Sequence, residues 1–180
     1  MRLTEHLAGL NADDQGAFAR RNAENASIEE LFDALDLDPL GEWAMLHLTD
    51  ALTRRGPGII GRIEARLVER PTRHGAYALG ETLIALLRDL PETGPAIVRV
   101  FIAAGEAALR TEASSRGART FVIHLADCAM ILERALPEAR PLARAFIVRA
   151  RDEPVPDTFS LGRASFLVGD EQGGDSGGPG

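Results

Sequence analysis

The sequence has little of several residue types, and each shortage excludes a class of protein. Cys128 is the single cysteine among 180 residues, so no intrachain disulfide can form, and we expect its thiol to be a small buried hydrophobe. Aromatic residues make up 5 %, and this favours a helical core over a β-sandwich. No apolar run approaches the ~20 residues that a membrane-spanning helix needs. The first ten residues lack the apolar segment of a signal peptide, so we expect a cytoplasmic protein.

Lysine is also missing, because every one of the 20 basic residues is an arginine. With 27 acidic residues, the net charge is −7 at neutral pH. A negative field of this kind repels DNA, RNA and anionic membranes. We therefore expect a protein partner or self-association, with no nucleic acid, no membrane and no cofactor.

Helix signals, in contrast, are abundant from residue 27 onward. Ser27 and Glu30 have the spacing of a capping box, and apolar residues follow at helical intervals. Prolines and glycines then mark the helix ends, because a proline and the residue before it disfavour continued helix. Before residue 26 we expect one or two helical turns at residues 3–10 and another short helix at residues 12–25. The predicted longer helices span residues 28–37, 42–55, 59–70, 76–90, 95–111, 118–136 and 138–151.

The C-terminal part departs from this helical pattern. We expect residues 1–154 to form a single helical domain, because Pro154 and Pro156 end the helical part of the chain. Residues 155–169 are too apolar for a free tail, so they are expected to form an extended arm or hairpin, either docked on the helices or bound by a partner. Residues 170–180 are mostly Gly, Asp and Ser, and a disordered tail is expected there.

Part of the sequence repeats with an offset of 46 residues. The segment LLRDLPETGPAIVRVFI, from Leu86, aligns with LERALPEARPLARAFIV, from Leu132, so that the Leu-Pro-Glu turns coincide. Upstream, Glu81 aligns with Asp127. A period of this length resembles the HEAT and armadillo class of helical repeats over residues 42–151. The resemblance implies stacked helical hairpins, although an irregular bundle explains the same pattern.

Near the end of the chain, residues 174–179 read GDSGGP, which is similar to the stretch around the nucleophilic serine of chymotrypsin-like proteases. That family places its catalytic His and Asp on β-barrel loops and builds its substrate pocket from a long segment after the serine. Here only four residues follow Ser176, and the sequence predicts no alternating strands. We interpret the similarity as coincidental.

Two His-x-x-Asp pairs are candidates for a chemical site. His47 and Asp50 lie on one predicted helix, and His124 and Asp127 lie on another. A spacing of three residues places both side chains of a pair on one helix face. Two such pairs on neighbouring helices could bind a divalent metal ion. In the alternative interpretation, each histidine hydrogen-bonds its own aspartate or caps a neighbouring helix.

A ridge of arginines is the other charged feature. Its four members share helical spacing: Arg62, Arg66, Arg70 and Arg73. Such a ridge could bind a phosphate or an acidic partner. We expect instead an exposed face that pairs with Glu64, with Glu69 and with the acidic helix at residues 28–37.

The expected fold is all-α, with antiparallel helical hairpins stacked as a short HEAT-like array or an irregular bundle. No catalytic, cofactor-binding or metal-binding residue is assigned. By analogy with such folds, the expected function is that of a protein–protein interaction or adaptor module without catalytic activity. Two alternatives stay open: a metal-dependent enzyme that uses His47, Asp50, His124 and Asp127, and a small-ligand sensor with an apolar pocket between helices.

Overall fold

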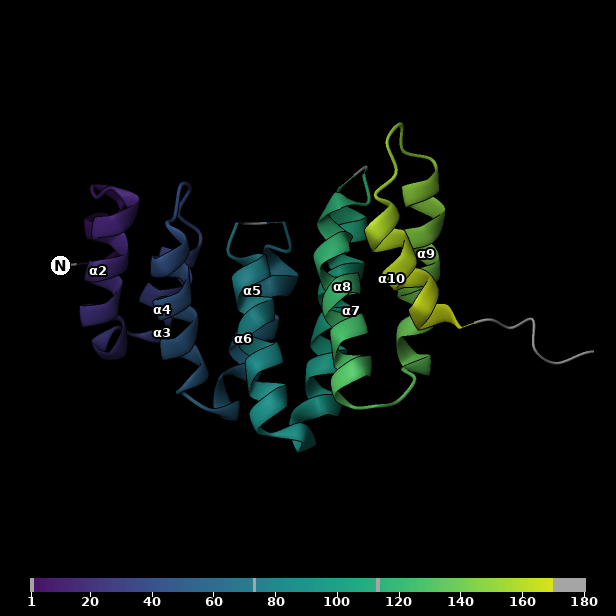
Figure 1. Ribbon diagram of the computed structural model, residues 1–180, viewed down its shortest axis with the longest axis horizontal. Helices are drawn as coiled ribbons and strands as arrows, with labels where there is room; N and C mark the ends of the chain where they lie inside the picture. Colours follow the sequence, from purple (N-terminus) through teal and green to yellow (C-terminus); the bar gives the residue numbers. More distant parts are fainter. Residues whose placement is uncertain (1, 73, 113, 170–180) are drawn as a thin grey trace, which may run out of the picture.

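The computed structural model describes residues 2–72, 74–112 and 114–169, and these residues fold into helices with no strand among them (Figure 1). The all-α prediction is therefore confirmed. The α-helices in this part of the chain are α1 (Leu3–Ala8), α2 (Ala12–Asn22), α3 (Ile28–Leu35), α4 (Glu42–Thr53), α5 (Ile60–Glu69), α6 (Ala76–Asp89), α7 (Gly94–Thr111), α8 (Arg116–Ile131), α9 (Arg140–Arg151) and α10 (Thr158–Val168).

The helices form two rows that run along the longest axis of the molecule (Figure 1). The even row consists of α2, α4, α6, α8 and α10, each packed on the next, and it lies nearer the viewer in Figure 1. The odd row consists of α1, α3, α5, α7 and α9. The even-row helices thus pack on the helix two places along the chain, and in the odd row α1 packs on α3, α5 on α7 and α7 on α9. This arrangement is compatible with a helical repeat class.

The connections between the rows follow from the prolines. Three short 3-10 helices begin with a proline and continue into an odd-row helix: Pro57–Ile59, Pro91–Thr93 and Pro137–Ala139. Proline fits a first helical turn because its missing amide hydrogen would have had no partner there. The two aligned Leu-Pro-Glu segments therefore adopt the same structure. At the start of α3, the predicted capping box is present, with the Ser27 hydroxyl accepting from the Glu30 amide at 3.3 Å.

The core lies between the two rows and contains mainly alanine, leucine, isoleucine and valine. Phe101, Phe121 and Phe146 are the largest side chains that are fully buried there. Small side chains let neighbouring helices approach closely. The side chains between them can then pack with few voids larger than a water molecule. The shortage of aromatic residues is thus matched to a tightly stacked array of helices.

The structure differs from the sequence-based expectation after residue 154. Residues 158–168 form a helix, α10. The prediction of an extended arm or hairpin for this segment was therefore wrong. Asp157 caps this helix, since its side chain accepts from the Ser160 amide at 3.1 Å. The helix packs on α8 and α9 through Ala164 and Leu167, so the segment is docked. The predicted helix 118–136 also ends earlier, at Ile131. The expected tail at 170–180, including Ser176, lies outside the described residues.

Candidate functional site

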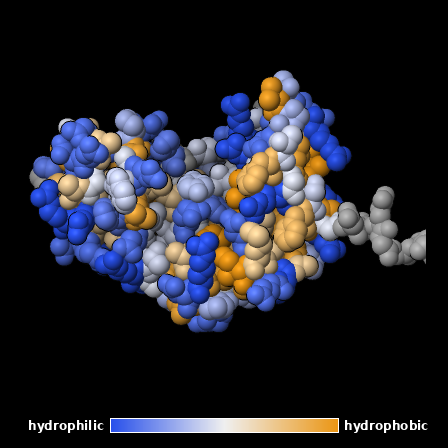
Figure 2. Space-filling view, viewed as in Figure 1, coloured by the Kyte–Doolittle hydropathy of each residue, from blue (hydrophilic) through white to orange (hydrophobic). Residues whose placement is uncertain are grey.

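Large apolar side chains are exposed chiefly on the even row. Figure 2, which looks onto this row, shows apolar groups over its middle and right-hand parts, while the left-hand part is mostly hydrophilic. Contiguous exposed apolar surface marks sites of interaction. The exposed apolar residues of the even row are Trp43 and Leu46 on α4, Tyr77 on α6, Met130 on α8, and Phe159 and Phe166 on α10.

A pocket of about 320 Å³ lies between α4 and α6. Trp43 and Leu46 form one wall and Tyr77 the other, and Met45, Thr49 and Ala78 complete the lining. Two carboxylates, from Glu42 and Glu81, also line it. The rings are prominent, because Trp43 is 63 % and Tyr77 is 50 % exposed. The pocket therefore combines aromatic faces with two acidic groups.

The backbone around Trp43 is fixed by close packing against α2. A Cβ atom at Gly16 would lie only 2.8 Å from the Trp43 Cβ, so α2 and α4 can approach this closely only because Gly16 has no side chain. The buried Gln15 side chain accepts from the Gly41 amide at 2.7 Å and donates to the Leu7 carbonyl at 3.0 Å. These contacts hold the start of α4 and leave the indole directed into the pocket.

Behind the α6 wall lies His124, a fully buried side chain of α8. Its ring stacks on Phe101 at a centroid distance of 5.1 Å and lies 5.6 Å from the Tyr77 ring. It occupies space that a side chain at position 80 would need, because a Cβ at Gly80 would lie 2.2 Å from Nε2. Neither ring nitrogen has a hydrogen-bond partner in the described part of the chain.

Burial sets the charges around His124. It lowers the pKa of His124 to about 4, and the nearby Tyr77 carbonyl opposes this only weakly, since its geometry is too poor for a hydrogen bond. His124 is therefore neutral at pH 7, although its Nδ1 lies 3.7 Å from Glu81 Oε1. Burial, followed by the charge of Glu81, raises the pKa of Tyr77, which stays a protonated phenol. The Glu81 carboxylate thus gains no compensating charge from His124.

The junction between α8 and α10 carries a similar set of groups, but it contains a cation. Arg163 of α10 donates to Asp127 Oδ1 at 3.2 Å and lies 3.9 Å from the Met130 sulfur. Its guanidinium also sits 5.1 Å from the centroid of the Phe159 ring. A second pocket of about 390 Å³ adjoins this junction, with Met130 and Phe166 in its lining. Asp127, the acid on α8, is therefore paired with Arg163 of the same chain.

The two predicted His-x-x-Asp pairs do not form one site. His47 and Asp50 line a small pocket against α2, where Asp50 pairs with Arg54. His124 points into the core, whereas Asp127 pairs with Arg163. Helix α6 lies between α4 and α8. In residues 2–72, 74–112 and 114–169 we find no group of three His, Cys, Asp or Glu side chains that could hold a metal ion.

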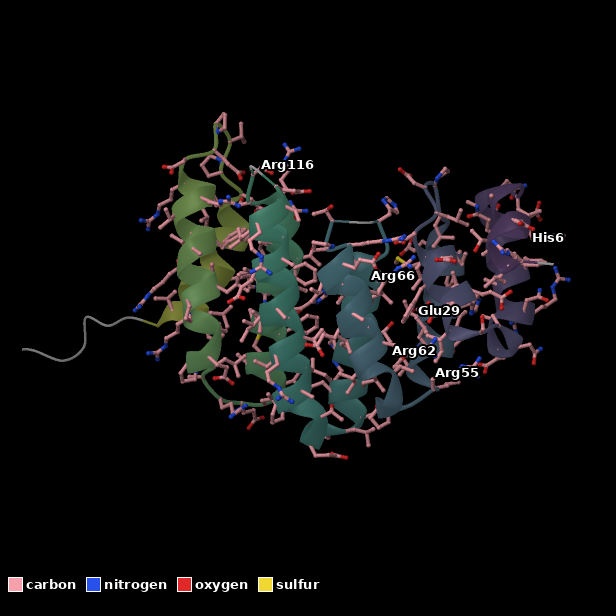
Figure 3. All side chains as sticks on the ribbon, turned by 180° about the vertical axis from the view of Figure 1, so that it is seen from behind. His6, Glu29, Arg55, Arg62, Arg66 and Arg116 are labelled. Carbon is pink, nitrogen blue, oxygen red and sulfur yellow. The ribbon has the colours of Figure 1, made fainter. Side chains whose placement is uncertain are left out.

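The arginine ridge lies on the odd row, where Figure 3 shows Arg62, Arg66 and Glu29 gathered between α5 and α3. Arg62 pairs with Glu29, and Arg66 pairs with Asp33 at 2.9 Å and Asp36 at 2.6 Å. Arg70 pairs with Glu69 at 3.4 Å. The predicted pairing with Glu69 and with the acidic helix is confirmed, while no pair with Glu64 occurs among the described residues. Arg73 lies outside them.

Cys128 is buried in α8, as expected, and burial raises the pKa of its thiol to about 12. A thiol with such a pKa stays protonated at neutral pH, and a protonated thiol is a poor nucleophile. Among the described helices, none is both long and apolar enough to cross a membrane. Comparison with protein families, curated proteins and solved structures gives no match for this chain.

The pocket residues were not predicted from the sequence, because Trp43 and Leu46 counted there only as apolar positions of the helix expected at 42–55. One signal could have identified them. The apolar residues of α4, at positions 43, 45, 46, 48 and 52, spread over more of the helix than a single buried stripe requires. An apolar surface wider than one stripe indicates that part of it stays outside the core.

Proposed function

We propose that this chain is a protein-binding module without catalytic activity, and that the even row is its binding face. The observation that carries the proposal is the concentration of exposed Trp, Leu, Tyr, Met and Phe side chains on α4, α6, α8 and α10. Aromatic residues and methionine are enriched where proteins bind one another. The cytoplasm remains the expected compartment, from sequence alone.

The arrangement of the helices supports the same proposal. In a HEAT-like array, which we propose for this fold, each hairpin contacts only its neighbours and the row of helices offers an extended surface. The two pockets lie at different places along the molecule: the first is between α4 and α6, and the second is between α8 and α10 beside the connection to α9. A polypeptide segment that crosses this face could place side chains in both.

The proposal can be tested with a displayed library of random peptides, about 12 residues long, selected on the intact chain. Peptides that bind are then measured by fluorescence polarisation against variants of the chain. Trp43→Ala is expected to weaken binding by about tenfold or more, because large aromatic residues dominate binding energies. Val148→Ala is the matched control, since Val148 is exposed on the odd row.

Two outcomes would contradict this function. In one, the selection yields no binding peptide. In the other, Trp43→Ala and Val148→Ala weaken binding equally, which would place the contact elsewhere. Thermal melts of both variants show whether a change in affinity reflects loss of the fold. A selective loss with Trp43→Ala in a folded protein supports the even row as the binding face.

A further inference from the structure

The α4–α6 pocket has an unbalanced charge. Glu42 and Glu81 both line it, and in the described part of the chain neither carboxylate pairs with an arginine. Among the described residues, the basic group that lies near Glu81 is His124, which is neutral at pH 7. Carboxylates beside aromatic rings attract cations, because both the charge and the ring faces favour a positive group.

The chain itself shows which group satisfies such a set of residues. Asp127 of α8 aligns with Glu81 of α6 at the 46-residue offset, and both lie nine positions before the leucine of a Leu-Pro-Glu turn. At Asp127 the cation is Arg163, which also contacts Met130 and stacks over Phe159. An acid, an aromatic ring and a thioether thus surround the guanidinium of an arginine at this junction.

Around Glu81, groups of the same chemical types come from α4 and α6, without the arginine. Met45, Trp43 and Tyr77 supply the thioether and the rings, and Glu42 adds a second carboxylate. On the side that faces α8, Glu81 meets the buried His124 ring. Its open side is the pocket. A cation must therefore enter from outside the described structure, through the exposed face of the even row.

We propose that the α4–α6 pocket binds an arginine side chain of a partner polypeptide, with apolar neighbours of that arginine resting on Leu46. The inference rests on the proposed function and names the chemistry of its partner. The guanidinium lies against the Trp43 or Tyr77 ring and pairs with Glu81 and Glu42. Arginine suits this site better than lysine, because its planar group stacks on rings and pairs with two carboxylate oxygens at once.

The peptides selected from the random library are the probes for this inference. We expect peptides selected on the natural chain to be enriched in arginine, and peptides selected on the Glu42→Gln/Glu81→Gln variant to lack that enrichment. Glu92→Gln is the matched control, an exposed carboxylate in the short 3-10 helix Pro91–Thr93 that follows α6. Replacing the peptide's arginine by citrulline, its neutral isostere, is expected to weaken binding by about tenfold.

Two further measurements locate the contact. Trp43 is the single tryptophan of the chain, so its fluorescence reports on the pocket directly. Binding of the arginine peptide is expected to change this emission. Raising NaCl from about 50 to about 500 mM is expected to lower the affinity of the arginine peptide, because salt screens the ion pairs. The affinity of the citrulline peptide should be nearly unchanged.

Several results would overturn the inference. Peptides that bind through Trp43 without an arginine would leave the proposed function standing and remove this partner chemistry. Equal affinity for arginine and citrulline peptides would do the same. Arg73→Gln tests whether the chain supplies the cation itself: unchanged affinity supports an outside arginine, and a gain of about tenfold or more overturns it. A selection without any binding peptide would remove both proposals.

Discussion

The junction between the α3–α4 hairpin and the α5–α6 hairpin has two faces that differ in chemistry. On the odd row, α3 and α5 meet through ion pairs. Arg62 and Arg66 of α5 neutralise three acids that belong to α3 or follow it directly. On the even row, α4 and α6 pack through apolar groups and leave Glu42 and Glu81 without one in the described residues. Among the described residues, the α3–α5 contact is thus made by paired charges, whereas the α4–α6 contact leaves two acids without an arginine.

This difference separates stability from binding at a single junction. Arg66 and Asp36 are largely buried, with side chains 14 % and 15 % exposed, so their ion pair belongs to the folded structure. The carboxylate of Glu81 is 41 % exposed and solvated. Charges on the odd face should therefore affect folding, and charges on the even face should affect binding.

The largest effect is expected behind the even face, where packing is tightest. Gly80→Ala places a methyl group 2.2 Å from His124 Nε2, and the ring cannot move without disturbing Phe101 and Tyr77. We expect a loss of about 3 kcal/mol in unfolding free energy, a cost typical of overpacking a core. Urea denaturation measures it. Gly61→Ala is the control, because nothing lies near its added Cβ. A loss shared equally by both variants would contradict the packing role of Gly80.

Acidification is expected to destabilise the same region. The pKa of His124 falls from 6.5 to about 4 on folding, so above pH 6.5 the ring is neutral in both states. As the pH falls from 6.5 towards 4, the unfolded chain binds a proton that the folded chain excludes. The folded state then loses about 3 kcal/mol in total, and this group costs no more below pH 4.

His124→Leu removes the titrating group and the two nitrogens that lack hydrogen-bond partners. We expect this variant to melt at a temperature at least equal to that of the natural chain at neutral pH, and to lose less stability between pH 6.5 and 4. Thermal melts across this range are the measurement. If the melting temperature of the natural chain did not change between pH 6.5 and 4, the prediction that His124 is buried and neutral would be contradicted.

The odd face should respond next in size. Arg66→Met removes the cation shared by Asp33 and Asp36, and we expect a loss of about 2 kcal/mol, between the values for exposed and buried ion pairs. Arg62→Met is the matched control on the same helix. Its pair with Glu29 is exposed, so the expected loss is below about 1 kcal/mol. Neither variant should change peptide affinity.

The smallest effect on stability is expected from the even-face acids. Glu81→Gln should change the unfolding free energy by less than about 0.5 kcal/mol, because a solvated carboxylate without an arginine contributes little. The same substitution should weaken the arginine peptide. Denaturation and polarisation assays on one protein preparation compare the two readouts. If Glu81→Gln destabilised the fold as much as Arg66→Met, the distinction between the faces would be lost.

Local signals predicted much of the fold. The capping box at Ser27 and the prolines at positions 57, 91 and 137 set helix boundaries through backbone geometry, which depends on a few adjacent residues. The helix α10 was missed for a related reason. Pro154 and Pro156 precede it, and Phe159 and Phe166 stay exposed, so its apolar residues do not form one buried stripe.

The candidate site was harder to predict, because it depends on which side of a helix each neighbour covers. His124 and Asp127 differ in direction by only about 60° around α8, yet the first faces α6 and the second faces α10. The spacing of three residues therefore did not make a shared site. In the sequence Trp43 is only one apolar position of a helix, and the positions of α2 and α6 show that it lies outside the core.

The α4–α6 pocket spans one junction of the even row, and its walls belong to different helices. Since each helix packs only on near neighbours, bending the whole array changes every junction angle by a small amount. A bend that spreads this junction moves Trp43 away from Tyr77, and the opposite bend brings the two rings together. The width of the pocket between these two rings is therefore set by the angle between α4 and α6.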